Sequence, residues 1–346
     1  MVFHKIEIEG FRGMRHALVN GFKQVNLFFG KNNCGKSSLL DALFLVSGLS
    51  NPSLPLQVNF VRGYGKTDLN DLRFLFYNLD ADNLICIKAD GRQQRDVTIS
   101  LFETERDKVF VGADKETVLS NIGRGLYGLR LNSTIDSKSL SAEVIFDDNS
   151  KKITSSSTLQ DYEETLHCSY LEPKYNFTAS IRGLANIVRN KDEHFIVDGL
   201  KLIEPRVIDF AFTDGELFVD IGLGKRIPIN MMGDGTRKIV SLLTAVYECK
   251  DGVLLVDEIS NGFHYSVMTG VWSVLIDAAN RNNTQLFVTT HDIDSIKGLR
   301  NAAMVGACAE SVAAFKLLKT ENDELKSYHY SVDSLDYAIN QEIELR

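Results

Sequence analysis

Polar and apolar residues alternate at the start of the chain, which predicts a β-strand over residues 3–9 with Phe3, Lys5 and Glu7 on one face and His4, Ile6 and Ile8 on the other. Phe11-Arg12-Gly13 interrupts the pattern, and the mainly apolar segment Val25–Phe29 predicts a second strand. A glycine-bounded turn follows. Leucines at helical spacing then predict a helix over residues 37–47. The chain therefore opens with a strand, a turn and an amphipathic helix.

The middle of the chain predicts a different kind of structure. Prolines and glycines at 50–66 favour a loop, and residues 84–112 favour hairpins built from three short runs, Leu84–Ile87, Val97–Leu101 and Val109–Val111. Residues 113–165 are polar and predict irregular structure, whereas residues 176–200 predict helix.

The last third returns to alternating strands and helices. Two short apolar runs, Val253–Val256 and Leu286–Thr290, are typical of buried parallel strands, and Tyr265–Asn280 between them predicts a helix. Two more strands, Val312–Leu318 and Leu325–Val332, and a helix over 334–343 complete the pattern. We expect an α/β fold with a mixed sheet.

One sequence motif carries specific chemistry. Residues 30–37 match GxxxxGK[ST] without substitution, between a strand and a helix: Gly30-Lys31-Asn32-Asn33-Cys34-Gly35-Lys36-Ser37. Glycines let such a loop wrap around phosphates, and amides at the helix N-terminus complement their charge. We expect Lys36 to contact the β- and γ-phosphates of a nucleotide and Ser37 to bind Mg²⁺.

Two acids follow the predicted strand Val253–Val256. Ligands of open α/β sheets bind at the carboxyl ends of the strands, so Asp257 is predicted to hold Mg²⁺ and Glu258 to act as general base toward water. His291 ends the strand that follows, 33 residues after Glu258, and is predicted to sense the γ-phosphate.

A second helix N-terminus is a candidate for phosphate binding. Met231-Met232-Gly233-Asp234-Gly235-Thr236-Arg237 opens an amphipathic helix about 20 residues before Asp257. Because of this position before Asp257, we interpret the turn as one that faces a phosphate.

Charge and cysteine content narrow the function classes. The net charge of −8 does not favour nucleic acid, but residues 1–66 carry eight Lys/Arg and three acids, which suits an anionic ligand such as a nucleotide or a DNA backbone. Five scattered cysteines without a CxxC pair indicate no zinc site and a reducing compartment. No signal-peptide core or membrane-length apolar run is present, so we expect a soluble, cytoplasmic protein.

Together, these motifs resemble those of the ATP-binding-cassette (ABC) ATPases. More narrowly, the chain is similar to the soluble, SMC-like ATPases that are grouped with the overcoming-lysogenization-defect (OLD) proteins and are called AAA-family ATP-binding proteins. The resemblance rests on Ile6–Gly13, the phosphate-binding loop (P-loop) at residues 30–37, Gly233-Asp234-Gly235, Asp257-Glu258 with Ile259–His264, and Tyr337–Arg346. It implies a P-loop NTPase fold of the ABC-ATPase type: a mixed central sheet flanked by helices, an antiparallel β subdomain and a small helical subdomain.

The resemblance also implies an organisation and a set of site residues. We expect one ATPase domain over 1–346, with a β-rich, irregular insert at 57–165 and a helical subdomain at 172–206. The lobe at 207–346 carries the signature turn at Gly233, the Walker B acids Asp257 and Glu258, and the switch histidine His291. Expected catalytic residues are Lys36, Glu258 and His291, with Ser37 and Asp257 as the metal ligands. The expected ATP-binding residues are Gly30, Lys31, Asn32, Asn33, Cys34, Gly35, Lys36, Ser37, Ser38, Gly233, Asp234 and Gly235.

Functionally, the resemblance implies a Mg²⁺-dependent ATPase that forms a dimer around ATP, with the turn at Gly233 acting on the partner copy's nucleotide. No Toprim nuclease domain follows His291, so we expect the ATPase to regulate a separate effector, such as a nuclease or toxin in anti-phage defence. Three departures from the family pattern stand out: no signature serine at 232–233, Ile259 in place of proline, and Glu172 where a lid-loop glutamine is expected. The alternative is a DNA-binding repair or chromosome-maintenance ATPase, and a transporter ATPase subunit ranks below it.

Overall fold

One large sheet organises the molecule. The computed structural model describes residues 1–63, 69–104, 126–147, 152–157, 162–173, 177–213, 215–343 and 345. Five parallel strands form one end of the sheet, in the spatial order β15 (Val312–Lys319), β3 (Val25–Phe29), β14 (Gln285–Thr290), β13 (Val253–Val256) and β9 (Cys168–Leu171), with β9 as the edge strand. Their carboxyl ends lie at one edge, where ligands of such sheets bind.

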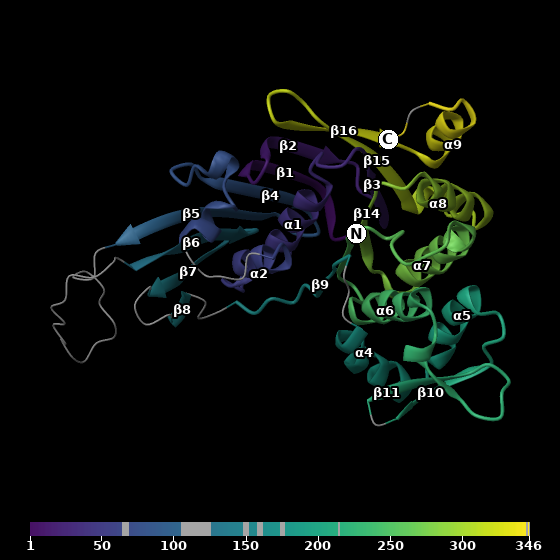
Figure 1. The fold of residues 1–346 in the computed structure, drawn as a ribbon. Coiled ribbons are helices and arrows are strands. Elements are labelled where there is room, and N and C mark those ends of the chain that lie inside the picture. Colours follow the sequence, from purple (N-terminus) through teal and green to yellow (C-terminus); the bar gives the residue numbers. More distant parts are fainter. Residues whose placement is uncertain are drawn as a thin grey trace.

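A mainly antiparallel wing extends from β15 (Figure 1). Its strands run in the order β16 (Glu324–Tyr330), β2 (Met14–Asn20), β1 (Phe3–Phe11), β4 (Ile85–Gly91), β5 (Arg95–Thr104), β6 (Leu126–Ile135), β7 (Lys138–Asp147) and β8 (Lys152–Ser157). Within it, β2 pairs with β16 in parallel. The β-rich middle of the chain thus continues the main sheet.

Helices cover both faces of the sheet. The helices are α1 (Lys36–Ser47), α2 (Leu54–Val61), α3 (Leu69–Arg73), α4 (Phe177–Arg189), α5 (Glu193–Ile203), α6 (Asp234–Glu248), α7 (Met268–Asn282), α8 (Ile293–Val305) and α9 (Val332–Asn340), with short 3₁₀ segments η1 (Tyr77–Leu79), η3 (Ile229–Met231), η4 (Tyr265–Val267) and η5 (Ala309–Ser311). A small sheet of β10 (Asp209–Thr213), β11 (Glu216–Asp220) and β12 (Ile227–Pro228) lies beside α4 and α5 (Figure 1).

Strand β3 is buried on both faces, which explains why four of its five residues are apolar. Phe28 belongs to a core that includes Leu39 and Leu43 of α1, while Leu27 and Phe29 belong to a core built with α6, α7 and α8. Both sides of the strand that leads into the P-loop are therefore fixed by packing.

Several expectations for the first half of the chain were wrong. The segment expected as a loop contains helix α2, because Pro55 lies in its first turn, where a missing N–H costs nothing. Phe11-Arg12-Gly13 is a hairpin turn rather than the end of the strand, and it leads into β2. Residues 126–157 contain strands β6, β7 and β8 instead of irregular structure. The strand expected at Val109–Val111 lies outside the described residues.

The face assignment in β1 also needs a correction. Phe3, Ile6 and Ile8 are all fully buried, although Phe3 was assigned to the face of Lys5 and Glu7. A register shift in the pairing with β4 between Phe3 and Lys5 changes the alternation at this point.

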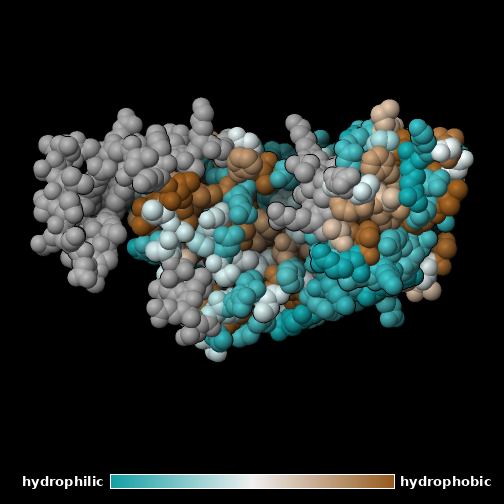
Figure 2. All heavy atoms as spheres, turned by 90° about the horizontal axis from the view of Figure 1, so that it is seen from below, coloured by the Kyte–Doolittle hydropathy of each residue, from teal (hydrophilic) through white to brown (hydrophobic). Residues whose placement is uncertain are grey.

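On the face shown in Figure 2, the coloured residues include broad hydrophilic areas and separate hydrophobic patches. Within the described part of the chain, no helix has both the length and the apolar character needed to cross a bilayer.

Candidate functional site

The P-loop connects β3 to α1 through a backbone that favours glycine at two positions. Gly30 has φ 146°, and a Cβ there would lie 2.4 Å from the carbonyl oxygen of Leu317. Gly35 has φ 101° and is the N-cap of α1. The first turn of α1 therefore presents its backbone amides to the loop, an arrangement that binds phosphate.

Lys36 is almost fully buried within this loop. Its Nζ donates hydrogen bonds to the carbonyl oxygens of Gly30 at 2.9 Å and Lys31 at 3.0 Å. The ammonium group is thus held at the loop where it is predicted to contact phosphate.

Asp257 at the end of β13 meets Ser37 directly. The Ser37 hydroxyl donates to Oδ1 of Asp257 at 3.0 Å, and the Thr289 hydroxyl of β14 donates to the same oxygen at 2.6 Å. This hydroxyl and this carboxylate are the oxygen donors that Mg²⁺ prefers, and their proximity fits a single ion between them. Thr289 was not predicted, because a threonine inside an apolar strand gives no separate signal.

A buried ion-pair network lies next to Asp257. Arg62, directly after α2, contacts Oδ2 of Asp257 at 3.3 Å and Oδ1 of Asp41 at 2.9 Å, and it donates to the Ser37 carbonyl oxygen at 3.2 Å. Arg12 pairs with Asp41 at 3.3 Å, and the Tyr170 hydroxyl donates to Asp41 at 3.0 Å. This network links α1 and α2 to the strand end at Asp257.

The sequence analysis missed this network, although one signal was present. Asp41 falls on the apolar face of α1, and its side chain is fully buried. Burial raises the pKa of Asp41, and the guanidinium groups of Arg12 and Arg62 oppose that shift. A buried acid requires a cation, which the sequence pattern could have suggested without naming it.

Glu258 and His291 form the polar pair next to this cluster. Nδ1 of His291 lies 2.7 Å from Oε2 of Glu258. The Glu258 backbone N–H donates to the Thr289 hydroxyl at 2.8 Å, and Glu258 has φ 55°, a left-handed conformation that is rare for a glutamate. Strained backbone of this kind is common at functional sites. The arrangement presents a carboxylate with an imidazole partner, which suits proton transfer.

Glu172 follows β9, the strand that pairs with β13. Burial raises the pKa of Glu172, Arg62 opposes the shift, and Asp41 and Asp257 add to it. Glu172 therefore lies within electrostatic reach of the site, at the place where the lid-loop residue was expected.

The turn that opens α6 makes its contacts with the segment after Asp257. Gly233 is the N-cap of α6, and the space around its Cα is open. A Cβ on Gly235 would instead lie 3.1 Å from the Gly262 carbonyl oxygen. Asp234 pairs with Arg237 in the first turn. The structure thus leaves open space beside Gly233 and packs Gly235 against its own chain.

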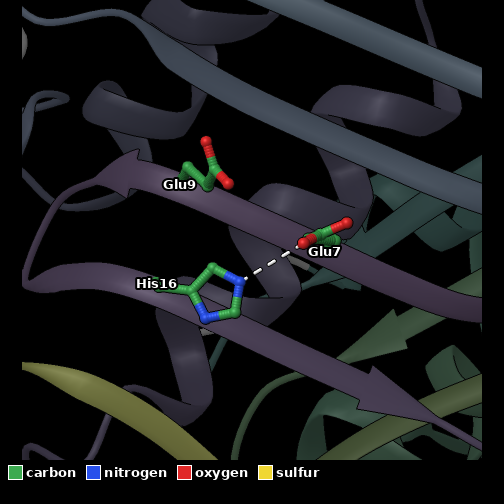
Figure 3. A group of neighbouring side chains, drawn as sticks. All are labelled: Glu7, Glu9 and His16. Carbon is green, nitrogen blue, oxygen red and sulfur yellow. Dashed lines mark hydrogen bonds and ion pairs between the residues drawn. The ribbon is translucent and has the colours of Figure 1, made fainter.

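A second polar group lies on the wing, where Glu7 and Glu9 of β1 and His16 of β2 bring their ligand atoms within 4.8 Å of one another (Figure 3). Nε2 of His16 lies 3.3 Å from Oε1 of Glu7, and all three side chains are at least partly open to solvent. We interpret this group as a surface hydrogen bond between His16 and Glu7 with Glu9 as a neighbouring acid.

The parallel sheet, the P-loop and the acids at the end of β13 define an ATPase of the ABC type with an SMC-like fold. The chain belongs to the family described as "AAA domain, putative AbiEii toxin, Type IV TA system", which matches residues 25–296. It is thus an AAA-family ATPase.

Two known proteins are similar to the chain, one in sequence and one in fold. The chain is 22% identical, over 373 aligned positions and 99% of both chains, to an ATP/GTP phosphatase of Helicobacter pylori (strain ATCC 700392 / 26695). Its fold is similar to the crystal structure of an SMC head bound to the C-winged-helix domain of ScpA, with a TM-score of 0.53, 11% identity, and coverage of 96% of this chain and 99% of the other. This structural likeness confirms the expected fold class.

Proposed function

We propose that the protein hydrolyses ATP with Glu258 as general base, and that two copies close around ATP to control a partner effector. The observation that carries the catalytic part is the convergence of Ser37, Asp257 and Thr289 at 2.6–3.0 Å next to the Glu258–His291 pair. Ser37 and Asp257 are 220 positions apart in the sequence, yet they meet because the strands that precede them end at one edge of the sheet.

Each residue has a role that its position supports. Lys36 and the amides of α1 bind the β- and γ-phosphates, and Ser37 and Asp257 hold Mg²⁺, which neutralises phosphate charge when bound. Glu258 accepts a proton from the attacking water, and His291 orients the Glu258 carboxylate and reaches toward the γ-phosphate.

The surface around Gly233 supports the two-copy arrangement. Gly233 has no side chain that could cap the N-terminus of α6, and the Thr236 N–H donates to the Gly233 carbonyl oxygen at 3.1 Å, so the amides of Asp234 and Gly235 are the ones proposed to meet an anion. Met231, just before this turn, is a large hydrophobic residue that is 78% exposed. We propose that Gly233, Asp234 and Gly235 cap the γ-phosphate held by the partner copy's P-loop, and that Met231 is covered on closure.

The effector is proposed from the relatives. The family description includes a toxin, and the similar SMC head is bound to a domain of another protein. We propose that ATP-driven closure controls a nuclease or toxin in anti-phage defence. The relative that is an ATP/GTP phosphatase makes GTP the first competing substrate to test.

The DNA-binding alternative has less free basic surface than the sequence alone suggested. Of the basic residues in 1–66, Lys36 is buried in the P-loop, and Arg12 and Arg62 pair with Asp41. Lys5 pairs with Asp90 on the wing. We therefore expect DNA affinity to be weak and strongly salt-dependent.

The test compares wild type, Glu258→Gln and the control Glu310→Gln, whose side chain is exposed in η5. Turnover is measured with ATP and GTP, and assembly is measured by light scattering with ATP or ADP. We expect Glu258→Gln to bind ATP, to turn it over about 10²–10⁴-fold more slowly, and to associate with ATP more than with ADP. Turnover within twofold of wild type would remove Glu258 as the base, and association indifferent to nucleotide would remove the two-copy arrangement.

A further inference from the structure

Lys238 makes three hydrogen bonds that the catalytic roles above do not use. It lies in the second turn of α6, and the residue is only 6% exposed. Its Nζ donates to the backbone carbonyl oxygens of Glu258 at 3.1 Å, Ile259 at 2.9 Å and Asn261 at 2.7 Å. All three donors of the ammonium group are thus directed at the segment that follows Asp257.

These carbonyl groups belong to backbone that regular structure does not hold. Glu258 is in the left-handed region, a strained conformation for a glutamate that persists only where surrounding contacts impose it. Lys238 supplies such contacts on the carbonyl side of Glu258, and Thr289 holds the N–H of the same residue at 2.8 Å. Together they fix the peptide units on both sides of the Glu258 side chain.

The same segment packs against the first turn of α6. The Gly262 carbonyl oxygen lies close to Gly235, and the Lys238 Nζ lies 5.4 Å from the centre of the Phe263 ring. The helix that begins after Gly233 and the segment that carries Glu258 therefore form one packed unit, with Lys238 at its centre.

We propose that Lys238 is a positioning residue that aims the Glu258 carboxylate and couples it to the N-terminus of α6. When the turn at Gly233 engages the partner's nucleotide, a shift of α6 reaches Glu258 of the same copy through these three hydrogen bonds. Capping one nucleotide then changes hydrolysis of the other. This inference rests on the proposed role of Glu258.

The burial of Lys238 supports a specific purpose for its charge. Removal from water lowers its pKa to about 8, against the opposing effect of Glu258. A buried ammonium group is a cost to the folded chain, and an apolar side chain at this place in α6 would avoid it.

The experiment is a double-mutant cycle between Lys238→Met and Glu258→Gln, with Lys250→Met as the control because Lys250 is exposed just beyond the end of α6. We expect Lys238→Met to lower kcat about 10–100-fold, the usual effect of losing a residue that orients a catalytic group, with KM changed less than about threefold. In the Glu258→Gln background, Lys238→Met should lower kcat less than about twofold, because its effect acts through Glu258. Lys250→Met should match wild type.

The outcomes separate the two proposals. If Glu258→Gln abolishes turnover while Lys238→Met stays within twofold of wild type, the coupling role is wrong and the proposed function stands. If Lys238→Met lowers kcat by the same factor in wild type and in the Glu258→Gln background, Lys238 has a structural role and does not act through Glu258. If Glu258→Gln turns over normally, the proposed base itself is wrong. Should Lys238→Met fail to fold, Lys238→Gln, which keeps two N–H donors, takes its place in the same cycle.

Discussion

Nδ1 of His291 and Oε2 of Glu258 lie 2.7 Å apart, so the imidazole at the end of β14 orients the carboxylate that follows β13. Two adjacent parallel strands thus deliver both groups to the same point. We expect His291→Ala to lower kcat about 10–100-fold while ATP affinity remains near wild type, because the carboxylate loses its orienting partner. Steady-state turnover with calorimetric ATP binding tests this. His4→Ala, exposed on β1, is the control, and a loss of affinity equal to the loss of kcat would assign His291 to binding instead.

Removal of the P-loop ammonium group should weaken nucleotide binding. Lys36→Ala deletes a cation that lies next to the proposed β- and γ-phosphate site, and charge-assisted hydrogen bonds are worth about 1.5–3 kcal/mol each. We expect ATP affinity to fall at least about tenfold in calorimetry, while the exposed Lys326→Ala control leaves it unchanged. Unchanged affinity in Lys36→Ala would contradict the assignment of the P-loop.

The Arg62 network should dominate the stability of the site without nucleotide. Arg62→Met leaves the fully buried Asp41 with Arg12 as its remaining cation and leaves one oxygen of Asp257 without its guanidinium partner. We expect the free energy of unfolding to fall by about 2–4 kcal/mol, toward the lower end of the range for broken buried pairs, because one cation remains. Adding Asp41→Asn should recover part of this loss.

Chemical denaturation measures both variants of that network. Arg130→Met removes a solvent-exposed pair with Glu143 on the wing and is the matched control, with an expected loss below about 1 kcal/mol. An equal loss from the two arginine substitutions would show that burial of the Arg62 network adds nothing.

Burial of Lys238 predicts a specific pH dependence of stability. The pKa is about 8 in the folded chain and 10.5 at its ordinary value, so between these values the unfolded chain binds more protons than the folded one. This group therefore makes folding more favourable as pH rises through this window. The difference in free energy of unfolding between wild type and Lys238→Met should shift in favour of wild type by about 1–3 kcal/mol across this window. If this difference does not change with pH, the three carbonyl groups keep Lys238 protonated in the folded chain and its pKa is not lowered.

Two neighbouring glycines should behave differently in ATP-driven association. Gly233 has open space around it and φ −63°, so Gly233→Arg is compatible with the folded chain and obstructs only a partner that approaches the turn. Gly235→Arg would press on the Gly262 carbonyl oxygen within its own chain. In the Glu258→Gln background, we expect Gly233→Arg to abolish association measured by light scattering while ATP binding persists. Association that survives Gly233→Arg would place the interface elsewhere.

The parallel part of the sheet could be predicted from the sequence better than the wing, for a physical reason. Strands β3, β13 and β14 are buried on both faces, so their sequences are mainly apolar, and each one leads into a recognisable motif. Strands β6, β7 and β8 contain many polar residues, with four consecutive exposed positions in β8, and their polar composition resembles a loop. Helix α2 was hidden by Pro52 and Pro55, because proline at a helix start has the same sequence signature as a turn.

The candidate site divides along a similar line. Lys36, Ser37, Asp257 and Glu258 belong to local motifs whose spacing reveals them. Arg62 and Thr289 act through contacts with residues distant in sequence, 195 positions away for Arg62 and Asp257. Such partners are set by the topology of the sheet, which no local pattern encodes.

The strand order around β3 has a consequence for how the nascent chain matures. Leu27 of β3 pairs with Val288 of β14 on one side and with Ala314 of β15 on the other, about 260 residues or more further along. Until those segments leave the ribosome, β3 has neither of its neighbours, and the P-loop that follows it lacks the Leu317 carbonyl against which Gly30 is packed. Pairing over such sequence distances is slow and comes late. A translation product that stops before residue 285 would therefore carry the whole P-loop sequence without a nucleotide site, so that ATP binding reports completed synthesis of the sheet.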